Sequence, residues 1–195
     1  GVPNQPTGLA ATAGIAIENA RLFEDSEYRA RWSTALVDVS RRLMSADEGD
    51  ELEGLIERLQ DLAQADLVSV SLTAGSDDEL VVERATGIGA DTLVGMSFPI
   101  DTTAAADPMR TGEPTIVDNL SLHPAHGFDE HTQLGNAMII PFSSSETTTG
   151  VLCVARVADK PPFASRDLDM GVSFAGHISL ALDRTEVRLT RRRME

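Results

Sequence analysis

The feature that most constrains this chain is a pair of apolar, β-rich runs followed by an amphipathic helix. Residues 136–142 (NAMIIPF) and 150–157 (GVLCVARV) flank the polar stretch SSSETTT, a pattern typical of a hairpin with a solvated turn. The breakers KPP come next, and a helical pattern then begins near Ser165, a candidate N-cap before an acidic first turn. Both strands are expected to be buried.

A helical pattern of unusual length precedes this region. Apolar residues recur at helical spacing from Thr7 to about Met44, which predicts one helix or two abutting helices of roughly 35 residues, about 50 Å long. A further helix is expected at residues 47–64, with a leucine-rich side that would face a sheet. The first helix is too long for a compact domain of this size, so part of it is expected to pack elsewhere.

Alternating and glycine-bounded segments predict the rest of a sheet. Residues 67–73 (LVSVSLT) place valine and leucine on one side and Ser69 and Ser71 on the other, as expected for a half-solvated antiparallel strand. The predicted fold class is α+β: an antiparallel sheet of five or six strands, helices on one face, and long helices at both ends. The other elements expected are strands at 79–85, 96–100 and 115–117 and a short helix at 102–110.

The order of these elements resembles that of a GAF domain, a small ligand-binding and signalling module. The resemblance covers most of residues 30–188 and rests on GEPTIVDNL, AMIIPF, GVLCVARV and the helix PFASRDLDMGVSFAGHISLAL. The sequence is similar in particular to the second GAF domain of actinobacterial and mycobacterial oxygen and redox sensor histidine kinases. The resemblance implies a non-catalytic sensory or regulatory domain of a bacterial two-component system, whose parent protein resembles a histidine kinase, a transferase.

An internal similarity predicts the domain organisation. The segment LAATAGIAIENARL at 9–22 resembles FAGHISLALDRTEV at 174–187, one domain length later. Residues 1–29 are therefore expected to be the C-terminal helix of a preceding GAF domain with its linker. Residues 30–188 form the GAF domain itself, and residues 189–195 begin a connector helix. A chance likeness between two alanine-rich helices is the alternative.

Composition excludes several classes of function. The net charge of −15 argues against nucleic-acid or anionic membrane partners. Cys153 is the one cysteine, which excludes an internal disulfide or a Cys-based zinc cluster and suits the reducing cytosol. Its position in mid-strand indicates a small buried side chain. No apolar run reaches the roughly 20 residues that span a bilayer, so a cytoplasmic location is expected. Neither a triad nor a phosphate-binding loop is evident.

The candidate site residue is a histidine in the irregular segment 118–132. His123, His126 and His131 cluster there, and a solvated loop is the simpler interpretation, with a metal or haem ligand as the alternative. In haem-bearing GAF domains of the sensor kinases, a histidine in this loop is the proximal iron ligand, and the resemblance carries that role to His131. The loop here lacks the prolines found around that ligand. The cofactor is therefore unknown, and a haem-bound gas or redox sensor using His131 is the alternative function.

Both terminal helices carry apolar stripes that one small sheet cannot cover. They predict a homodimer in which these helices form a parallel bundle on a two-fold axis. An upstream GAF domain and a downstream kinase region would be partners within the parent chain, and the identity of a small-molecule ligand is not written in the sequence. The residues expected at the seam are Leu9, Ile17, Phe23, Trp32, Leu36, Leu180, Leu182, Val187 and Leu189.

Overall fold

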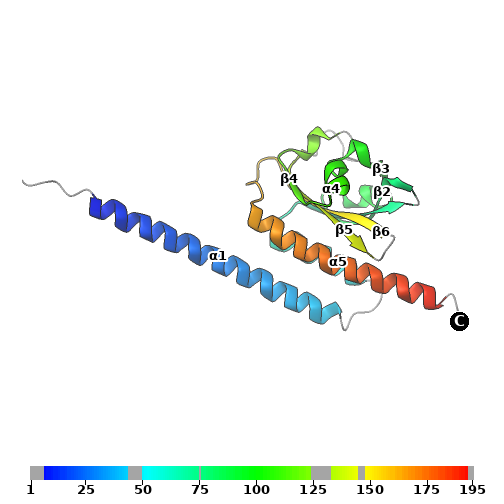
Figure 1. Ribbon diagram of the computed structural model, residues 1–195, viewed down its shortest axis with the longest axis horizontal. Coiled ribbons are helices and arrows are strands. Elements are labelled where there is room, and N and C mark those ends of the chain that lie inside the picture. The colour runs from blue at the N-terminus through cyan, green and yellow to red at the C-terminus, as the bar shows by residue number, and fades with distance from the viewer. Residues whose placement is uncertain (1–6, 44–49, 75, 124–132, 145–147, 193–195) are drawn as a thin grey trace, which may run out of the picture. The chain divides into compact units, whose positions relative to one another are not determined.

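The computed structural model describes residues 7–43, 50–74, 76–123, 133–144 and 148–192, and the chain divides into two compact units, 1–38 and 39–195. The helix α1 (Thr7–Leu43) is continuous over 37 residues, and most of it forms the first unit (Figure 1). Tyr28 and Trp32, one turn apart on α1, have ring centroids 5.9 Å from each other. Within the described ranges, no helix is both long and apolar enough to cross a membrane.

The second unit is built on a six-stranded antiparallel sheet with the strand order β3-β2-β1-β6-β5-β4. The predicted hairpin is present as β5 and β6, with Phe142 opposite Gly150 and Ile139 opposite Cys153. The antiparallel sheet and the long helices at both ends are therefore confirmed. The strands are β1 (Leu67–Ala74), β2 (Ser76–Gly87), β3 (Ser97–Pro99), β4 (Thr115–Val117), β5 (Leu134–Ser144) and β6 (Thr148–Val157).

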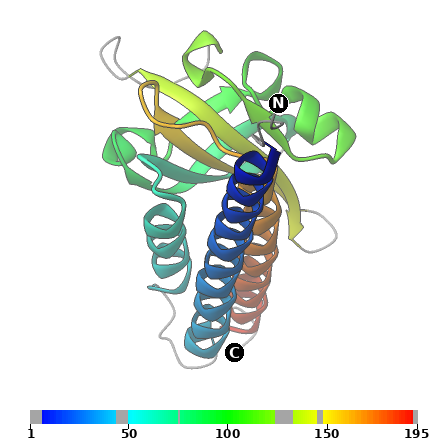
Figure 2. The same ribbon diagram turned by 90° about the vertical axis from the view of Figure 1, so that its left-hand side faces the viewer.

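Long and short helices lie on different sides of this sheet. The long helices α2 (Asp50–Ala63) and α5 (Ser165–Arg192) pack against each other and against the sheet on one side, which we call the helix face (Figure 2). In the part of the chain that the structure describes, the helices on the other side are all short, and they lie in the connections that follow β2, β3 and β4. These are α3 (Ala90–Leu93), η1 (Ile100–Thr102), α4 (Ala106–Thr111) and η2 (Leu120–Leu122).

The helix face carries a row of fully buried apolar side chains. Successive strand residues point to opposite faces, so β1, β5 and β6 each present every second residue to α2 and α5. Gly171 shows how closely α5 approaches, because a Cβ added there would lie 2.5 Å from Cδ1 of Ile140. The side chains of these three strands that face the helices and are at most 1% exposed are Val68, Val70, Met138, Ile140, Leu152 and Val154.

The start of α5 differs slightly from the prediction. Ser165 was the expected N-cap, but the helix already begins at Ser165, so Ala164 occupies the preceding position. The backbone N–H of Ala164 donates to the carboxylate of Asp167 at 2.7 Å, and the N–H of Asp167 returns a bond to the Ala164 carbonyl at 2.9 Å. A carboxylate in the first turn therefore caps the helix instead of the serine hydroxyl.

A buried amide joins three separate segments near this helix start. Asn136, on β5, is only 7% exposed. Its side-chain NH₂ donates to the Val117 carbonyl on β4 at 3.0 Å, and its oxygen accepts from the backbone N–H of Phe163 at 2.6 Å. Because both backbone groups would otherwise lack these partners, Asn136 holds the segment before α5 against the edge of the sheet.

Candidate functional site

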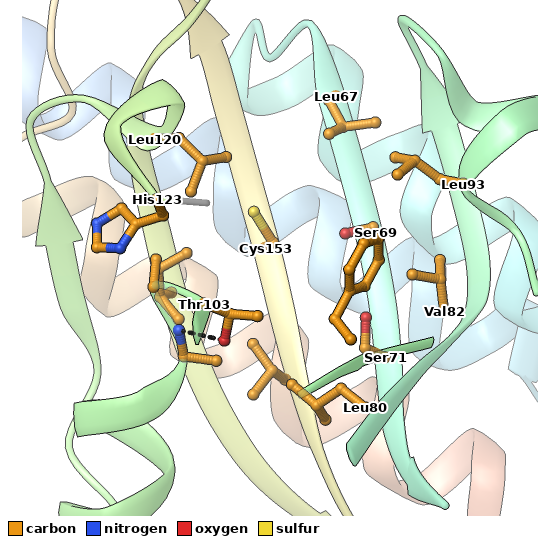
Figure 3. Close-up of a pocket in the computed structure, with 15 residues that line it drawn as sticks. Leu67, Ser69, Ser71, Leu80, Val82, Leu93, Thr103, Leu120, His123 and Cys153 are labelled. Carbon is orange, nitrogen blue, oxygen red and sulfur yellow. Dashed lines mark hydrogen bonds between the residues drawn. The ribbon is translucent and has the colours of Figure 1, made fainter. Parts of the chain in front are cut away.

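A cavity of about 90 Å³ lies on the side of the sheet opposite α2 and α5 (Figure 3). We call this side the serine face, because Ser69 and Ser71 of β1 point toward it. Strands β1, β2, β5 and β6 supply the floor, and the short elements of the serine face supply the other walls. The lining residues are Leu67, Ser69, Ser71, Leu80, Val82, Leu93, Phe98, Thr103, Ala104, Ala105, Leu120, His123, Ile139, Val151 and Cys153.

The floor follows directly from the strand register. Ser69 of β1 lies opposite Cys153 of β6, and Cys153 lies opposite Ile139 of β5, so the three side chains form a row across the central strands. The sequence correctly separates the serines from the neighbouring valines. The expected half-solvated strand is wrong for Ser69, which is only 8% exposed, because the connections around α3, α4 and η2 cover the serine face.

Cys153 contributes a neutral thiol to the cavity wall. The side chain is half-buried, and burial raises the pKa of the Cys153 thiol to about 12, although a hydrogen bond from the Ser69 side chain acts in the opposite direction. The thiolate is the reactive form of cysteine, and at neutral pH almost none of it is present with such a pKa. Cys153 is therefore a wall of the cavity and not a nucleophile.

The remaining polar side chains of the cavity differ in whether they make hydrogen bonds within the protein. The Thr103 hydroxyl donates to the Ile100 carbonyl at 2.8 Å and accepts from the Ala105 N–H at 3.1 Å, so it holds the turn that precedes α4. Within the part of the chain that the structure describes, neither the Ser71 hydroxyl nor the His123 ring makes a hydrogen bond. These two groups are the free polar atoms of the cavity.

The histidines divide between described and undescribed residues. His123 is half-buried and lies among the residues that line the cavity. His126 and His131 lie outside the described residues, and the assignment of His131 as a haem ligand stays a prediction. Over the described ranges, no three His, Cys, Asp or Glu side chains are grouped so that they could hold a metal ion.

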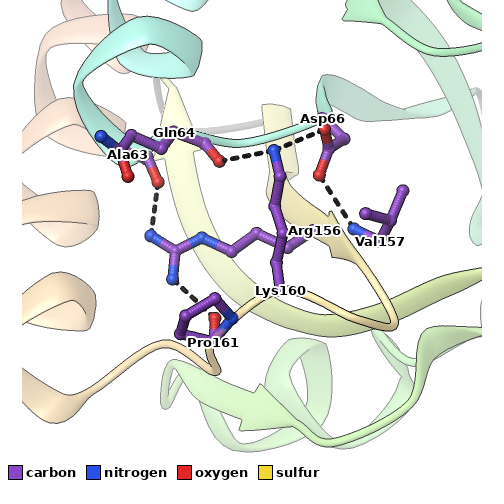
Figure 4. A network of polar contacts seen from close by, with 7 residues as sticks. All are labelled: Ala63, Gln64, Asp66, Arg156, Val157, Lys160 and Pro161. Atoms are coloured by element: carbon purple, nitrogen blue, oxygen red, sulfur yellow. Dashed lines mark hydrogen bonds and ion pairs between the residues drawn. The ribbon is translucent and has the colours of Figure 1, made fainter.

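A network of charged side chains ties the end of α2 to the loop that follows β6 (Figure 4). Asp66, next to the cavity residue Leu67, accepts from Lys160 Nζ at 2.7 Å and from the Val157 N–H at 2.9 Å. Arg156 donates to the Ala63 carbonyl at 2.5 Å, and its guanidinium lies 4.0 Å from the centre of the Phe163 ring. Cations thus meet the carbonyl end of α2, where the helix dipole favours them.

The electrostatics of Asp66 reflect this network. Burial by itself raises the pKa of a carboxyl group, but hydrogen bonds from Lys160 and Val157 and the charges of Lys160 and Arg156 together outweigh it. The pKa of Asp66 therefore lies below its ordinary value of 3.8. A carboxylate whose pKa is lowered by folding stabilises the fold above the unfolded-state pKa, and this contribution is lost as the pH falls through the folded-state pKa.

Replacing Asp66 with asparagine should make the free energy of unfolding less dependent on pH in the acidic range. At pH 7 we expect Asp66→Asn to lower the free energy of unfolding by about 1–3 kcal/mol, because it weakens bonds to a cation and to a partly buried backbone N–H. Urea denaturation should show this difference shrinking below about pH 4, where the carboxyl group of the unfolded chain becomes protonated. Asp107→Asn is the control, since Asp107 is 83% exposed in its pair with Arg110 and its loss should change stability by less than about 0.5 kcal/mol. Equal acid sensitivity in the Asp66→Asn protein and the wild type would contradict the assignment.

Comparison with known proteins finds one matching family model and several solved structures of the same fold. The family model described as GAF domain matches residues 45–183. The GAF domain of a phosphoenolpyruvate-protein phosphotransferase from Coxiella burnetii superposes with a TM-score of 0.69 at 17% identity, covering 82% of this chain and 96% of that one. The GAF-B domain of DevS from Mycobacterium smegmatis has a TM-score of 0.58 at 22% identity, covering 76% and 100%. The GAF domain of a putative sensor histidine kinase from Pseudomonas syringae pv. tomato has a TM-score of 0.62 at 13% identity, covering 89% and 99%.

Proposed function

The chain belongs to the GAF domain family, and from this we propose that it is a cytoplasmic, non-catalytic sensory domain of a bacterial two-component sensor histidine kinase. The parent chain would carry an upstream GAF domain and a downstream kinase region, and the terminal helices would pair in a homodimer and pass the signal on. Structural relatives in a DevS protein and in a putative sensor histidine kinase support this context, although another relative belongs to a phosphotransferase.

The observation that carries the proposal is that β5 and β6 lie between the cavity and the helix face, with alternate residues pointing to each side. Cys153 and Ile139 line the cavity, whereas Leu152 and Ile140, their neighbours in sequence, point to the helix face. Ile140 lies directly beneath Gly171 of α5. A ligand that displaces β5 or β6 by a fraction of an ångström would therefore also displace α5, because close-packed elements transmit small shifts.

Pairing of the helices is supported by the apolar side chains that they expose. On α1, Ile17 is 64% and Phe23 is 65% exposed, and on α5 Leu180 is 54% exposed. Large apolar side chains with this exposure on helices of 37 and 28 residues suit a helical interface with a second copy. The expectation is wrong for Trp32, which is only 1% exposed and so has no free surface for a second copy. The side chains of Leu9, Leu36, Val187 and Leu189, also expected at the seam, lie outside the described set.

Sedimentation velocity over a range of concentrations tests the dimer. We expect a dimer whose fraction grows up to about 100 μM, well above the micromolar dissociation constant that corresponds to about −8 kcal/mol. Ile17→Asp combined with Leu180→Asp should shift the protein to a monomer with an unchanged circular dichroism spectrum. Ile88→Asp, which places the same charge on a 40% exposed isoleucine outside both helices, should leave the dimer intact. A protein that is monomeric at every concentration would rule out relay through paired helices.

A further inference from the structure

We propose that the cavity binds a small uncharged, mostly apolar molecule, no larger than a single aromatic ring and carrying one hydrogen-bonding group, and that it rejects nucleotides and other anions. This inference rests on the proposed function, because it assumes that the cavity is where the sensory domain takes up its ligand. It adds the chemical class of that ligand. Three properties of the described cavity walls carry it: their charge, their hydrogen-bonding state and their size.

The first property is the absence of aspartate, glutamate, lysine and arginine from the described lining residues. Ten of the fifteen are aliphatic, alanine or phenylalanine side chains, and the rest are serine, threonine, histidine and cysteine. An anion moved from water into such surroundings loses its hydration without gaining an opposite charge, which is strongly unfavourable. The net charge of −15 on the whole chain adds a repulsive field for anionic ligands.

The second property is the small number of polar atoms left for a ligand. The Thr103 hydroxyl is occupied by Ile100 and Ala105, and the Ser69 side chain lies opposite the Cys153 thiol, whose pKa it lowers. Ser71 and His123 remain, and Figure 3 shows them on opposite sides of the Cys153 strand. A hydroxyl and an imidazole each both donate and accept, so either one can bind a neutral alcohol, phenol or amide group.

The third property is size. A dry apolar cavity of about 150 Å³ takes up benzene, and the present cavity has about 90 Å³. The present volume is the smaller of the two, so a molecule the size of a single ring already fills the described walls, and a branched chain of about four carbon atoms fits more easily. A cyclic nucleotide, with its base, ribose and phosphate, exceeds this size and also brings a charge that the described walls do not match.

A set of probes of similar size separates charge from shape. Isobutanol and phenol are the neutral probes, isobutyrate and isobutylammonium are the charged counterparts, and 3′,5′-cyclic AMP represents nucleotides. Titrations followed by ¹H–¹⁵N NMR should show saturable shifts at the amides of Ser69, Ser71 and Cys153 with both neutral probes. Affinity for isobutanol should exceed that for either charged counterpart by at least about tenfold, because of the desolvation of the charge.

Cavity-filling variants show whether the probes bind where we propose. Cys153→Leu fills the cavity from the floor and Ala105→Leu from the opposite wall, so if one of them fails to fold the other still tests the site. Each should weaken binding of isobutanol by at least about tenfold, since the added side chain occupies the space of the ligand. Val172→Ala, a change at a 43% exposed position on α5, should bind all probes as the wild type does.

Two results would overturn the inference, and they are distinguishable. Tighter binding of isobutyrate or cyclic AMP than of the neutral probes, abolished by the filling variants, would refute the ligand class but leave a ligand-binding sensory cavity in place. No saturable shift at the three amides with any probe would remove both the ligand class and the sensory role of this cavity.

Discussion

Replacing Gly87 with alanine is expected to lower the free energy of unfolding by about 2–4 kcal/mol. Gly87 has a φ of 99°, a conformation that residues with a Cβ rarely adopt and that adds about 1–3 kcal/mol of strain. A Cβ there would also lie 2.1 Å from the Asp66 carbonyl oxygen. That oxygen accepts from the Ile88 N–H at 2.8 Å, so the chain would have to move and would weaken a bond worth about 1 kcal/mol.

Gly54→Ala is the matched control for this change. Gly54 lies on α2, its φ is outside the positive range, and nothing lies within 4 Å of the position that a Cβ would take. Alanine there should raise the free energy of unfolding by roughly 0.5–1 kcal/mol, because it restricts the unfolded chain and favours the helix. Urea denaturation of both variants, followed by circular dichroism, measures the two effects. If the free energy of unfolding of Gly87→Ala lay within 0.5 kcal/mol of the wild-type value, the result would contradict the close contact between Gly87 of β2 and the Asp66 carbonyl.

Replacing Ile140 with alanine should lower the free energy of unfolding by about 2–5 kcal/mol, the range for truncation of a buried aliphatic side chain. Ile140 is 1% exposed, and it fills the space between β5 and the backbone of α5 at Gly171. Glycine has no side chain with which to fill the resulting cavity. Ile88→Ala removes the same atoms at a 40% exposed site and should lower stability by less than about 1 kcal/mol.

A second substitution tests the contact between Ile140 and α5 directly. The methyl group introduced by Gly171→Ala would lie 2.5 Å from Ile140 Cδ1, so it crowds the wild-type protein but fits the Ile140→Ala protein. The double variant should therefore be more stable than the sum of the two single effects by at least about 0.5 kcal/mol. Strict additivity in urea denaturation would show that α5 does not rest on Ile140, and the proposed link between cavity and helix would lose its structural basis.

Local patterns in the sequence are sufficient to predict most of the helices and strands of the fold. Alternation in LVSVSLT, the apolar runs of the hairpin and the helical spacing after Ser165 each report on neighbours within a few residues, which is the distance at which side-chain periodicity acts. The helix α2, predicted at 47–64, is observed at Asp50–Ala63. The strand predicted at 115–117 is observed there as β4.

The cavity and its surroundings depend on contacts between distant residues and could not be predicted in this way. Alternation separates Ser69 from Val68 and Val70, but it does not reveal that a later segment covers the serine. Asn136 and Asp66 look like ordinary polar residues beside apolar runs, and their roles arise from partners 27 and 94 positions away. A polar residue flanked by buried strand positions was the one available signal.

The strand order also determines when this domain can fold during synthesis. The hairpins β1–β2 and β5–β6 each join neighbouring strands, but the two halves of the sheet meet only where β1 pairs with β6, as when Leu67 lies opposite Ala155. Such distant pairing is slow to form, because a long loop must close first. On the ribosome, the edge of β1 in the first hairpin therefore stays unpaired until β6 has left the exit tunnel. An exposed strand edge of this kind is a site of aggregation.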